Sequence, residues 1–489
     1  MKKINYIGIA FVFLIGFSTQ AQDLQIQQGP AKVWTLEECV RYALDNNIQI
    51  KQTSLDSQNA EIDKRGAKGN FLPSVNASAG HSWNVGLNQN ITTGLLENQT
   101  TQYTSLGASI GIDIYKGMQN QNTLRRANLA LVAAKYQLTK MQEDVALNVA
   151  NAFLQVLFNK EFLKVQIKQK EIDEKQLGRS QELVNAGTIP RGDLLDIQAT
   201  IASDTQKVIA AENQLLISKL SLAQLLQIKE FYNFDVADDT TVQDENNIMM
   251  QTPVQIYDKA KTLRTELKIA QTNLEIAMKD LAIAKGAYQP TLQAFYNFNT
   301  RASYSAIVTG YAPNTTNPTS VIGYVQGTNQ DVLQPNFSPV TGSALPIFDQ
   351  FNNNKGQSIS AQLNIPIFNG FSVRNNVDRN KVNVEKTKIA LEQEELSLQR
   401  NVYTAYTDAK GAMNAHESAL VALEARQGSY NYAKEKYAVG LMNSFDFFQS
   451  QTLLTNAQSE VIRTKYDYIF KIKILEFYFG IPIIQIMQK

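Results

Sequence analysis

The stretch SLGASIGIDIYKGMQNQNTLRRANLALVAAKYQLTKMQ, residues 105–142, changes its hydrophobic period part-way along. Up to Lys116, apolar residues alternate with small or polar ones, which is typical of a β-strand with one apolar face. From Leu124 onward, apolar residues return every seven positions, which predicts a long helix packed against a partner. These positions are Leu124, Leu131, Leu138 and Val145. The stretch therefore predicts a strand that passes into a long helix at Gly117.

No proline occurs between Pro73 and Pro190, so a helix over residues 119–185 meets no interruption. At 1.5 Å per residue it would be about 100 Å long. Gly187 suits the end of such a helix, and Asp193 suits the start of a returning helix. The sequence thus predicts a long helical hairpin.

The same plan recurs later in the chain. Gly117, Gly187 and Asp193 are repeated 253 residues on by Gly370, Gly440 and Asp446, and nearer the start an Ala-Lys-Gly motif at 67–69 is repeated 217 residues on. Apolar residues alternate again at Ile359, Ala361, Leu363, Ile365 and Ile367, which predicts a strand as far as Ile367. The two offsets differ by 36 residues, which we assign to a long polar loop at 299–355. An internal duplication explains the matching glycines and aspartates better than chance does.

We therefore divide the chain into four parts. Residues 1–21 are predicted to be a secretory signal, because Lys2 and Lys3 precede a short apolar stretch. Residues 22–230 form a first repeat of helix, β-hairpin, long helix and helix, and residues 231–252 form a linker or equatorial segment. Residues 253–489 form the second repeat, with its loop at 299–355, which is expected to be either a strand-hairpin tip or a disordered insertion.

The composition excludes several classes of protein. Removal of the signal leaves 44 Lys and Arg against 45 Asp and Glu, so nothing indicates binding to nucleic acid. The single Cys39 and the two histidines, His81 and His416, predict neither a disulfide framework nor a metal site. No cofactor motif or catalytic constellation occurs, so we do not expect an enzyme. No stretch after the signal has about 18 consecutive apolar residues, so any membrane crossing would use strands.

Four strands cannot close a barrel, because open edges are not tolerated in lipid. Two or three chains would supply eight or twelve strands. The alternative is a periplasmic or surface coiled-coil scaffold or adhesin without a pore, which would explain the heptads and the signal but not the duplicated strands.

Three features carry a resemblance to a known family. The opening run WTLEECVRYALDNN (34–47), the strand-to-helix run LNIPIFNG (363–370) and the two Gly-x5-Asp turns resemble outer-membrane efflux proteins of the TolC family. The resemblance covers nearly the whole mature chain. It implies a homotrimer in the bacterial outer membrane, with a shared twelve-stranded barrel and a coiled-coil α-helical tunnel in the periplasm.

The same resemblance implies the partners. The channel would be the passive exit duct of a tripartite efflux or type I secretion system. It would contact outer-membrane lipid and dock to a periplasmic adaptor, a membrane fusion protein, and through it to an inner-membrane pump. Turn residues are expected to meet the adaptor, namely Gly187, Thr188, Gly440 and Leu441. Drug, metal and protein all remain possible substrates.

The resemblance also implies a pore gate. Asp446 stands in the place of the first aspartate of an acidic ring in TolC, and Gln449 replaces the second. The same spacing in the first repeat gives Asp193 and Asp196. Tyr437 matches a gate tyrosine. The alternative is that Asp193 and Asp446 only stabilise helix starts.

Overall fold

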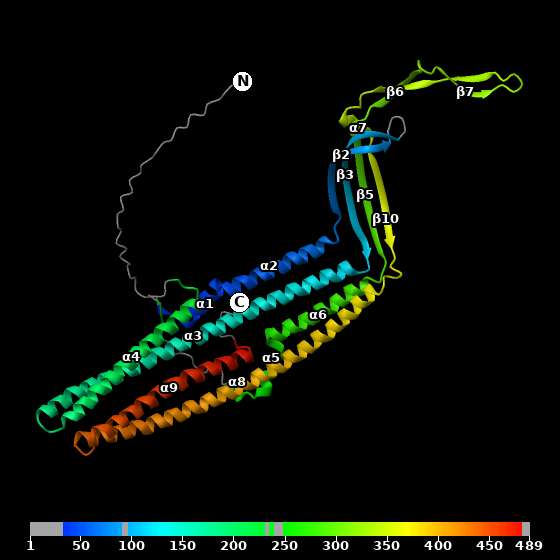
Figure 1. The fold of residues 1–489 in the computed structure, drawn as a ribbon. Helices are drawn as coiled ribbons and strands as arrows, with labels where there is room; N and C mark the ends of the chain where they lie inside the picture. The colour runs from blue at the N-terminus through cyan, green and yellow to red at the C-terminus, as the bar shows by residue number, and fades with distance from the viewer. Residues whose placement is uncertain (1–32, 90–95, 230–233, 239–247, 482–489) are drawn as a thin grey trace, which may run out of the picture. The chain divides into compact units, whose positions relative to one another are not determined.

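The computed structural model describes residues 33–89, 96–229, 234–238 and 248–481 (Figure 1). The predicted signal, residues 1–21, lies outside this part. The first repeat contains β1 (Val33–Trp34), α1 (Leu36–Asn46), α2 (Ile48–Gly69), β2 (Ser74–Gln89), β3 (Leu96–Lys116), α3 (Gln119–Asn185) and α4 (Arg191–Leu225). Between the repeats lie β4 (Asp235–Val236) and the 3-10 helix η1 (Ile248–Met250). The second repeat contains α5 (Pro253–Leu263), α6 (Thr265–Gly286), β5 (Thr291–Ser303), β6 (Ile307–Pro313), β7 (Thr319–Tyr324), β8 (Asp331–Pro335), β9 (Phe337–Gly342), α7 (Ile347–Asn353), β10 (Gly356–Asn364), α8 (Ser372–Ala438) and α9 (Ser444–Phe479).

The chain divides into two compact units. The helical unit comprises the described residues of Met1–Ala43, Val149–Gln243 and Ala422–Tyr466. The sheet unit comprises those of Leu44–Asn148, Asp244–Val421 and Asp467–Lys489. The helices α3 and α8 are each 67 residues long, and α3 has the bounds 119–185 that the absence of proline predicted. In the described residues, no helix carries the long apolar run that crossing a lipid bilayer would need.

The sheet unit holds a four-stranded sheet in the order β10-β5-β3-β2, and every pair in it is antiparallel (Figure 1). The two repeats share this sheet, because β3 of the first pairs with β5 of the second. The register aligns similar side chains across all four strands. One row is Val75, Ile110, Tyr296 and Ile359, and the next is Asn76, Ser109, Asn297 and Ser358. Neighbouring residues point to opposite faces, so these rows give the sheet one apolar and one polar face.

The strand β10 is shorter than the sequence predicted. It ends at Asn364, whereas the alternation predicted a strand up to Ile367. Pro366 has no N–H to donate to a neighbouring strand, which explains the early end. The last two residues of the alternating pattern, Ile365 and Ile367, lie beyond the strand and are exposed.

The helix that opens each repeat is broken at a matching position. Asn47 separates α1 from α2, and Arg264, 217 residues later, separates α5 from α6. Asn47 accepts hydrogen bonds from two N–H groups of α2. Arg264 donates to Glu143 and Glu266 at 3.1 Å and lies 3.8 Å above the Phe477 ring. Both breaks bury a polar side chain with its partners, and periodicity alone predicted one helix in each place.

The segment predicted as a long loop, residues 299–355, carries strands and a short helix. β6 pairs with β9 and β7 with β8, and α7 follows (Figure 1). Gln350 of α7 fixes the base of this segment to β5. Its Nε2 donates to the carbonyls of Ser303 and Leu345 at 2.9 and 2.7 Å, and its Oε1 accepts from the Ser303 N–H at 2.8 Å. Connections this long rarely lack structure of their own.

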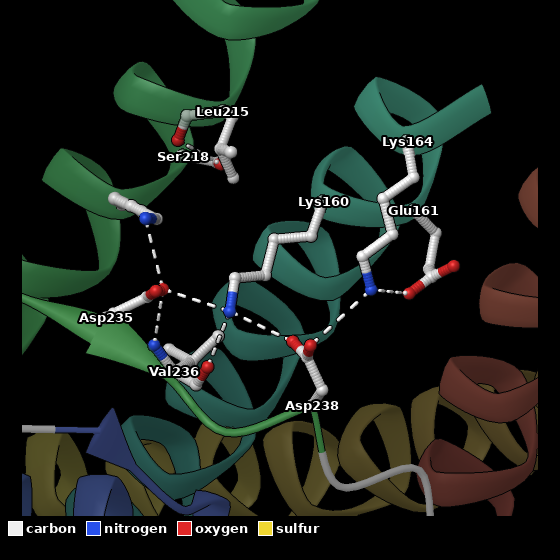
Figure 2. Close-up of polar contacts among 9 residues, drawn as sticks. Lys160, Glu161, Lys164, Leu215, Ser218, Asp235, Val236 and Asp238 are labelled. Atoms are coloured by element: carbon white, nitrogen blue, oxygen red, sulfur yellow. Dashed lines mark hydrogen bonds and ion pairs between the residues drawn. The ribbon is translucent and has the colours of Figure 1, made fainter. Parts of the chain in front are cut away.

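Within the predicted linker, 231–252, the described residues 234–238 belong to the helical unit and are anchored there. Lys160 Nζ of α3 lies 3.1 Å from Asp235 and 2.9 Å from Asp238 (Figure 2). Lys219 Nζ of α4 lies 3.0 Å from Asp235. Burial opposes ionisation of Asp235, but hydrogen bonds from Lys219 and Lys160 hold its pKa below the usual value. These ion pairs fasten the linker to both helices of the first hairpin.

Candidate functional site at the hairpin turns

Both helical hairpins turn at a glycine within the helical unit. Gly187 and Gly440 have φ of +73° and +75°, a left-handed conformation that glycine adopts without strain. The N–H groups of the next residues, Thr188 and Leu441, donate to carbonyls five residues earlier at 3.0 and 2.9 Å. This is the bond of a Schellman helix end. The structure confirms that each long helix ends at a left-handed glycine.

Asp446 belongs to a reciprocal cap at the start of α9. Its backbone N–H donates to Asn443 Oδ1 at 2.8 Å, and its Oδ2 accepts from Asn443 Nδ2 at 3.0 Å. The side chain of Asp446 is exposed. One carboxylate oxygen is therefore tied to the turn. Sequence reasoning missed Asn443, although an Asn three residues before an Asp is a recognisable capping pattern.

The first turn is built differently. Asp193 lies in the first turn of α4 and is half-buried, while Asp196 is exposed. Pro190 precedes this helix and has no side chain that could cap it, so the helix dipole favours the charge of Asp193. In the described part of the chain, no hydrogen bond or ion pair joins Asp193 or Asp196 to the predicted gate residues of the second turn.

The remaining gate candidates have separate surroundings. Tyr437 of α8 stacks on Phe447 of α9, with ring centroids 4.6 Å apart and planes 8° apart. Phe447 is itself buried, so this contact joins the two helices beside the turn. Gln449 is exposed. The structure therefore gives Tyr437 a packing role within the chain and leaves Gln449 open to a partner.

The second turn exposes a group of large apolar side chains. Val439 is 69%, Leu441 77% and Phe445 72% exposed. At the first turn the matching position to Leu441 is the polar Thr188, whose hydroxyl donates to the Leu183 carbonyl at 2.8 Å. Contiguous exposed apolar groups mark protein contact sites, so the second turn is the stronger candidate for binding a protein partner.

A buried polar cluster connects the two hairpins. Asp173 of α3 is 0% and Asp204 of α4 is 3% exposed. Asp173 accepts from Gln169 at 2.8 Å and from Gln451 of α9 at 2.6 Å. Burial first, and then the hydrogen bond with Asp204, raise the pKa of Asp173 to about 7. The cluster lines a cavity of about 740 Å³ between these three helices.

Sequence reasoning missed this cluster. Nothing in the heptad pattern distinguishes a buried aspartate from one on the solvent side of a long helix.

In the part of the chain that the structure describes, no group of three or more His, Cys, Asp or Glu side chains could hold a metal ion.

A family model described as "Outer membrane efflux protein" matches residues 40–226 and 256–470. The chain belongs to this family. The match falls into two segments, one in each repeat, as an internal duplication requires.

Outer membrane protein TolC of Escherichia coli (strain K12) is 22% identical over 470 residues, covering 96% of this chain and 84% of that protein. Among solved structures, the outer membrane protein VceC of Vibrio cholerae has a TM-score of 0.73 at 12% identity, covering 92% of this chain and 97% of VceC. The CmeC outer membrane channel of Campylobacter jejuni has a TM-score of 0.69 at 16% identity, covering 91% of this chain and 85% of CmeC.

The efflux family settles the class of the protein. The chain is an outer-membrane efflux channel of the TolC type, located in the outer membrane, and it is not an enzyme. Its long helices and antiparallel strands form the TolC-like fold. The family implies a trimeric channel in an efflux system. A scaffold or adhesin without a pore, the alternative from sequence, does not fit this family.

Proposed function

We propose that three copies of this efflux protein close one twelve-stranded barrel in the outer membrane and continue it as a helical tunnel in the periplasm. The observation that carries the proposal is the sheet order β10-β5-β3-β2, whose outer strands have unpaired edges in the described residues. Unpaired backbone groups are too costly in lipid, so the edges of β2 and β10 must meet those of other copies. The family supplies the number three.

The faces of the sheet support the same arrangement. The apolar row contains Val75 and Ile359, which are 68% and 84% exposed in the single chain. The adjacent polar row, Asn76 to Ser358, lies on the opposite face. In a membrane barrel, apolar side chains face lipid and polar ones face the lumen. Each chain would thus supply one third of the wall.

The hairpin turns are then the docking end of a passive exit duct. A periplasmic adaptor would contact Gly187, Thr188, Gly440 and Leu441, and would connect the duct to an inner-membrane pump. Exposed Leu441 and its apolar neighbours support this role, because apolar groups desolvated at an interface contribute to its affinity.

A ring of acids would form the gate near these turns. Asp446, with Asp193 and Asp196, would place like charges from three chains around one opening, and Gln449 would line it. Closely spaced carboxylates attract cations and repel anions. Tyr437 would hold α8 and α9 together beside the ring through its stack on Phe447.

The proposed assembly is tested by its mass. The full chain, extracted in detergent and not heated, should have three times the mass of the chain by light scattering, and should dissociate on boiling. A folded monomer extracted from the outer membrane would contradict the shared barrel.

A further inference from the structure

The two hairpins of each chain are linked by a buried polar contact that the gate and the docking surface do not use. It involves α3 and α4 of the first hairpin and α9 of the second. The residues are Gln169, Asp173, Asp204, Gln451 and Thr455, all within the helical unit. Their burial makes every unpaired charge costly, so their protonation state matters.

The geometry leaves a place for one proton. Asp173 accepts from two amides, and it lies with Asp204 in the wall of one cavity, where both side chains are buried and Asp204 raises the pKa of Asp173. Asp204 Oδ1 accepts from Lys207 at 2.9 Å, while its buried Oδ2 has no N–H or hydroxyl donor among the described residues. Two carboxylates cannot be hydrogen-bonded to each other unless one carries a proton. A single shared proton would join the two acids by a hydrogen bond and remove the repulsion between them.

The contact reaches the helix that begins at the gate. Gln451 of α9 is 2% exposed, and its Nε2 donates to Asp173 Oδ1 at 2.6 Å. One helical turn further, Thr455 donates to Gln169 Oε1 at 2.6 Å. Gln451 lies five residues after Asp446, which is about 7.5 Å along the helix. Movement of α9 away from α3 would therefore move Asp446.

The contact also breaks the internal duplication. The positions 253 residues after Asp173 and Asp204 are Arg426 and Ala457, so the second repeat has no such acid pair. The position matching Gln451 in the first repeat is Gln198, which is exposed. The cluster thus connects one hairpin to the other. It is not part of the helix packing that the two hairpins have in common.

We propose that Asp173 and Asp204 share one proton, and that this protonated pair is a latch that holds α9, and with it Asp446, against the first hairpin. Loss of the proton leaves two buried carboxylates facing each other, and their repulsion separates α3, α4 and α9. Gln451 is a positioning residue for the gate. The inference depends on the proposed function for its channel readout, but the shared proton can be tested without it.

The other titratable groups around the cluster do not supply a charge that would stabilise ionised Asp173. Lys207 on α4 already pairs with Asp204, and Arg463 on α9 pairs with Glu460 in the wall of the same cavity. From α8, Tyr430 stays neutral, because burial and then the charge of Asp173 raise its pKa. Among the residues that the structure describes, no cation forms an ion pair with Asp173, because Lys207 and Arg463 pair with other acids. Its raised pKa means that the latch is intact at low pH and is lost as pH rises through about 7.

The channel test is single-channel recording of the full trimer in planar bilayers, with the pH on the periplasmic side varied from 6 to 8. The wild-type open probability should rise with pH, by up to about tenfold per unit above 7. Asp204→Asn should stay closed over the whole range, because an amide donates to Asp173 without any titration. Asp446 is unchanged in both proteins, so the acidic ring cannot produce the difference. A flat wild-type profile, or a step that persists in Asp204→Asn, overturns the latch.

Control variants distinguish loss of the Gln451–Asp173 hydrogen bond from a general disturbance of the helices. Gln451→Leu should open the channel at pH 6, whereas Gln198→Leu, at the repeat-related exposed position, should keep the wild-type profile. Glu171→Gln, an exposed carboxylate on α3, should also keep it. Equal effects of Gln451→Leu and Gln198→Leu would contradict the positioning role.

Infrared spectroscopy tests the proton itself. The C=O band of a protonated carboxyl should be present at pH 6, vanish by pH 8 and be missing in Asp173→Asn. If the band is present but the protein forms no pore, the proposed channel assembly fails and the proton site stands. If the protein conducts but the band is missing at pH 6, the latch fails and the channel stands.

Discussion

Gly117 shows how one residue can serve the fold through its missing side chain. It has φ of +57°, and a Cβ there would overlap the carbonyl of Gly286. Gly370, at the repeat-related position, has φ of +61° but open space around it. Gly370→Ala should cost about 1 kcal/mol of unfolding free energy from backbone strain. Gly117→Ala should cost roughly 3 kcal/mol or more, because a close backbone contact is also lost.

Thermal unfolding of the two alanine variants, followed by circular dichroism, measures the comparison. A clearly lower midpoint for Gly117→Ala than for Gly370→Ala is expected. Equal midpoints would show that the backbone contact with Gly286 contributes nothing.

The charge of Asp446 should control ion selectivity. Removal of the carboxylate in Asp446→Ala should lower the preference of the closed pore for cations and weaken block by divalent or trivalent cations from the periplasmic side. Asn443→Ala is the matched control, because it removes the cap at the same helix start and keeps the charge. Reversal potentials in a salt gradient give the selectivity. If Asn443→Ala alters it as much as Asp446→Ala, Asp446 acts as a helix-start residue and not as a gate.

The roles of single residues could be predicted from the sequence where they depend on neighbours in the chain. Gly187 and Gly440 were predicted from helix-end chemistry, which depends on a few neighbouring residues. The pairing of Asp173 with Gln451 could not be predicted, because the two residues are 278 positions apart and each lies in an ordinary helical pattern. Only packing of three helices makes that aspartate buried.

At the scale of elements, the segment 299–355 is expected at the cell surface. It leaves the sheet between β5 and β10 and returns through α7, so it lies at the end of the strands opposite their connections to the long helices. Protease added to intact cells should cut within residues 304–345 before it cuts the helical hairpins. Cleavage that requires a broken outer membrane would place the segment in the periplasm and reverse the topology.

The long helices, the strand pairs and their duplication were predictable, because a period of two or seven extends over many residues. The helix break at Arg264 was not, since this buried arginine and its ion pairs with Glu143 and Glu266 mark the break without proline or glycine. The end of β10 before Pro366 could have been predicted, because proline removes a backbone donor. The paired strands within 299–355 were hidden by a polar composition typical of loops.

In the whole molecule, the proposed barrel requires the sheet of each copy to join the sheets of the others. Within one chain, β2 and β10 are three strand spacings apart, about 14 Å, which exceeds the reach of a disulfide. Between copies, the same two edges should be neighbours. Barrel closure therefore predicts a crosslink that can form only between chains.

The direct measurement is disulfide crosslinking in a series of variants that each carry two new cysteines. One cysteine replaces Asn76 of β2, on the polar face, or a neighbour of it. The other replaces Ser358 of β10 or a neighbour of it. Cys39 is replaced by serine, so that no native thiol competes. Oxidation in outer membranes should give covalent dimers and trimers on denaturing gels for at least one register, and monomers alone for either single cysteine. If every pair in properly inserted protein gives only monomers, the sheets of different copies do not join, and the shared barrel is wrong.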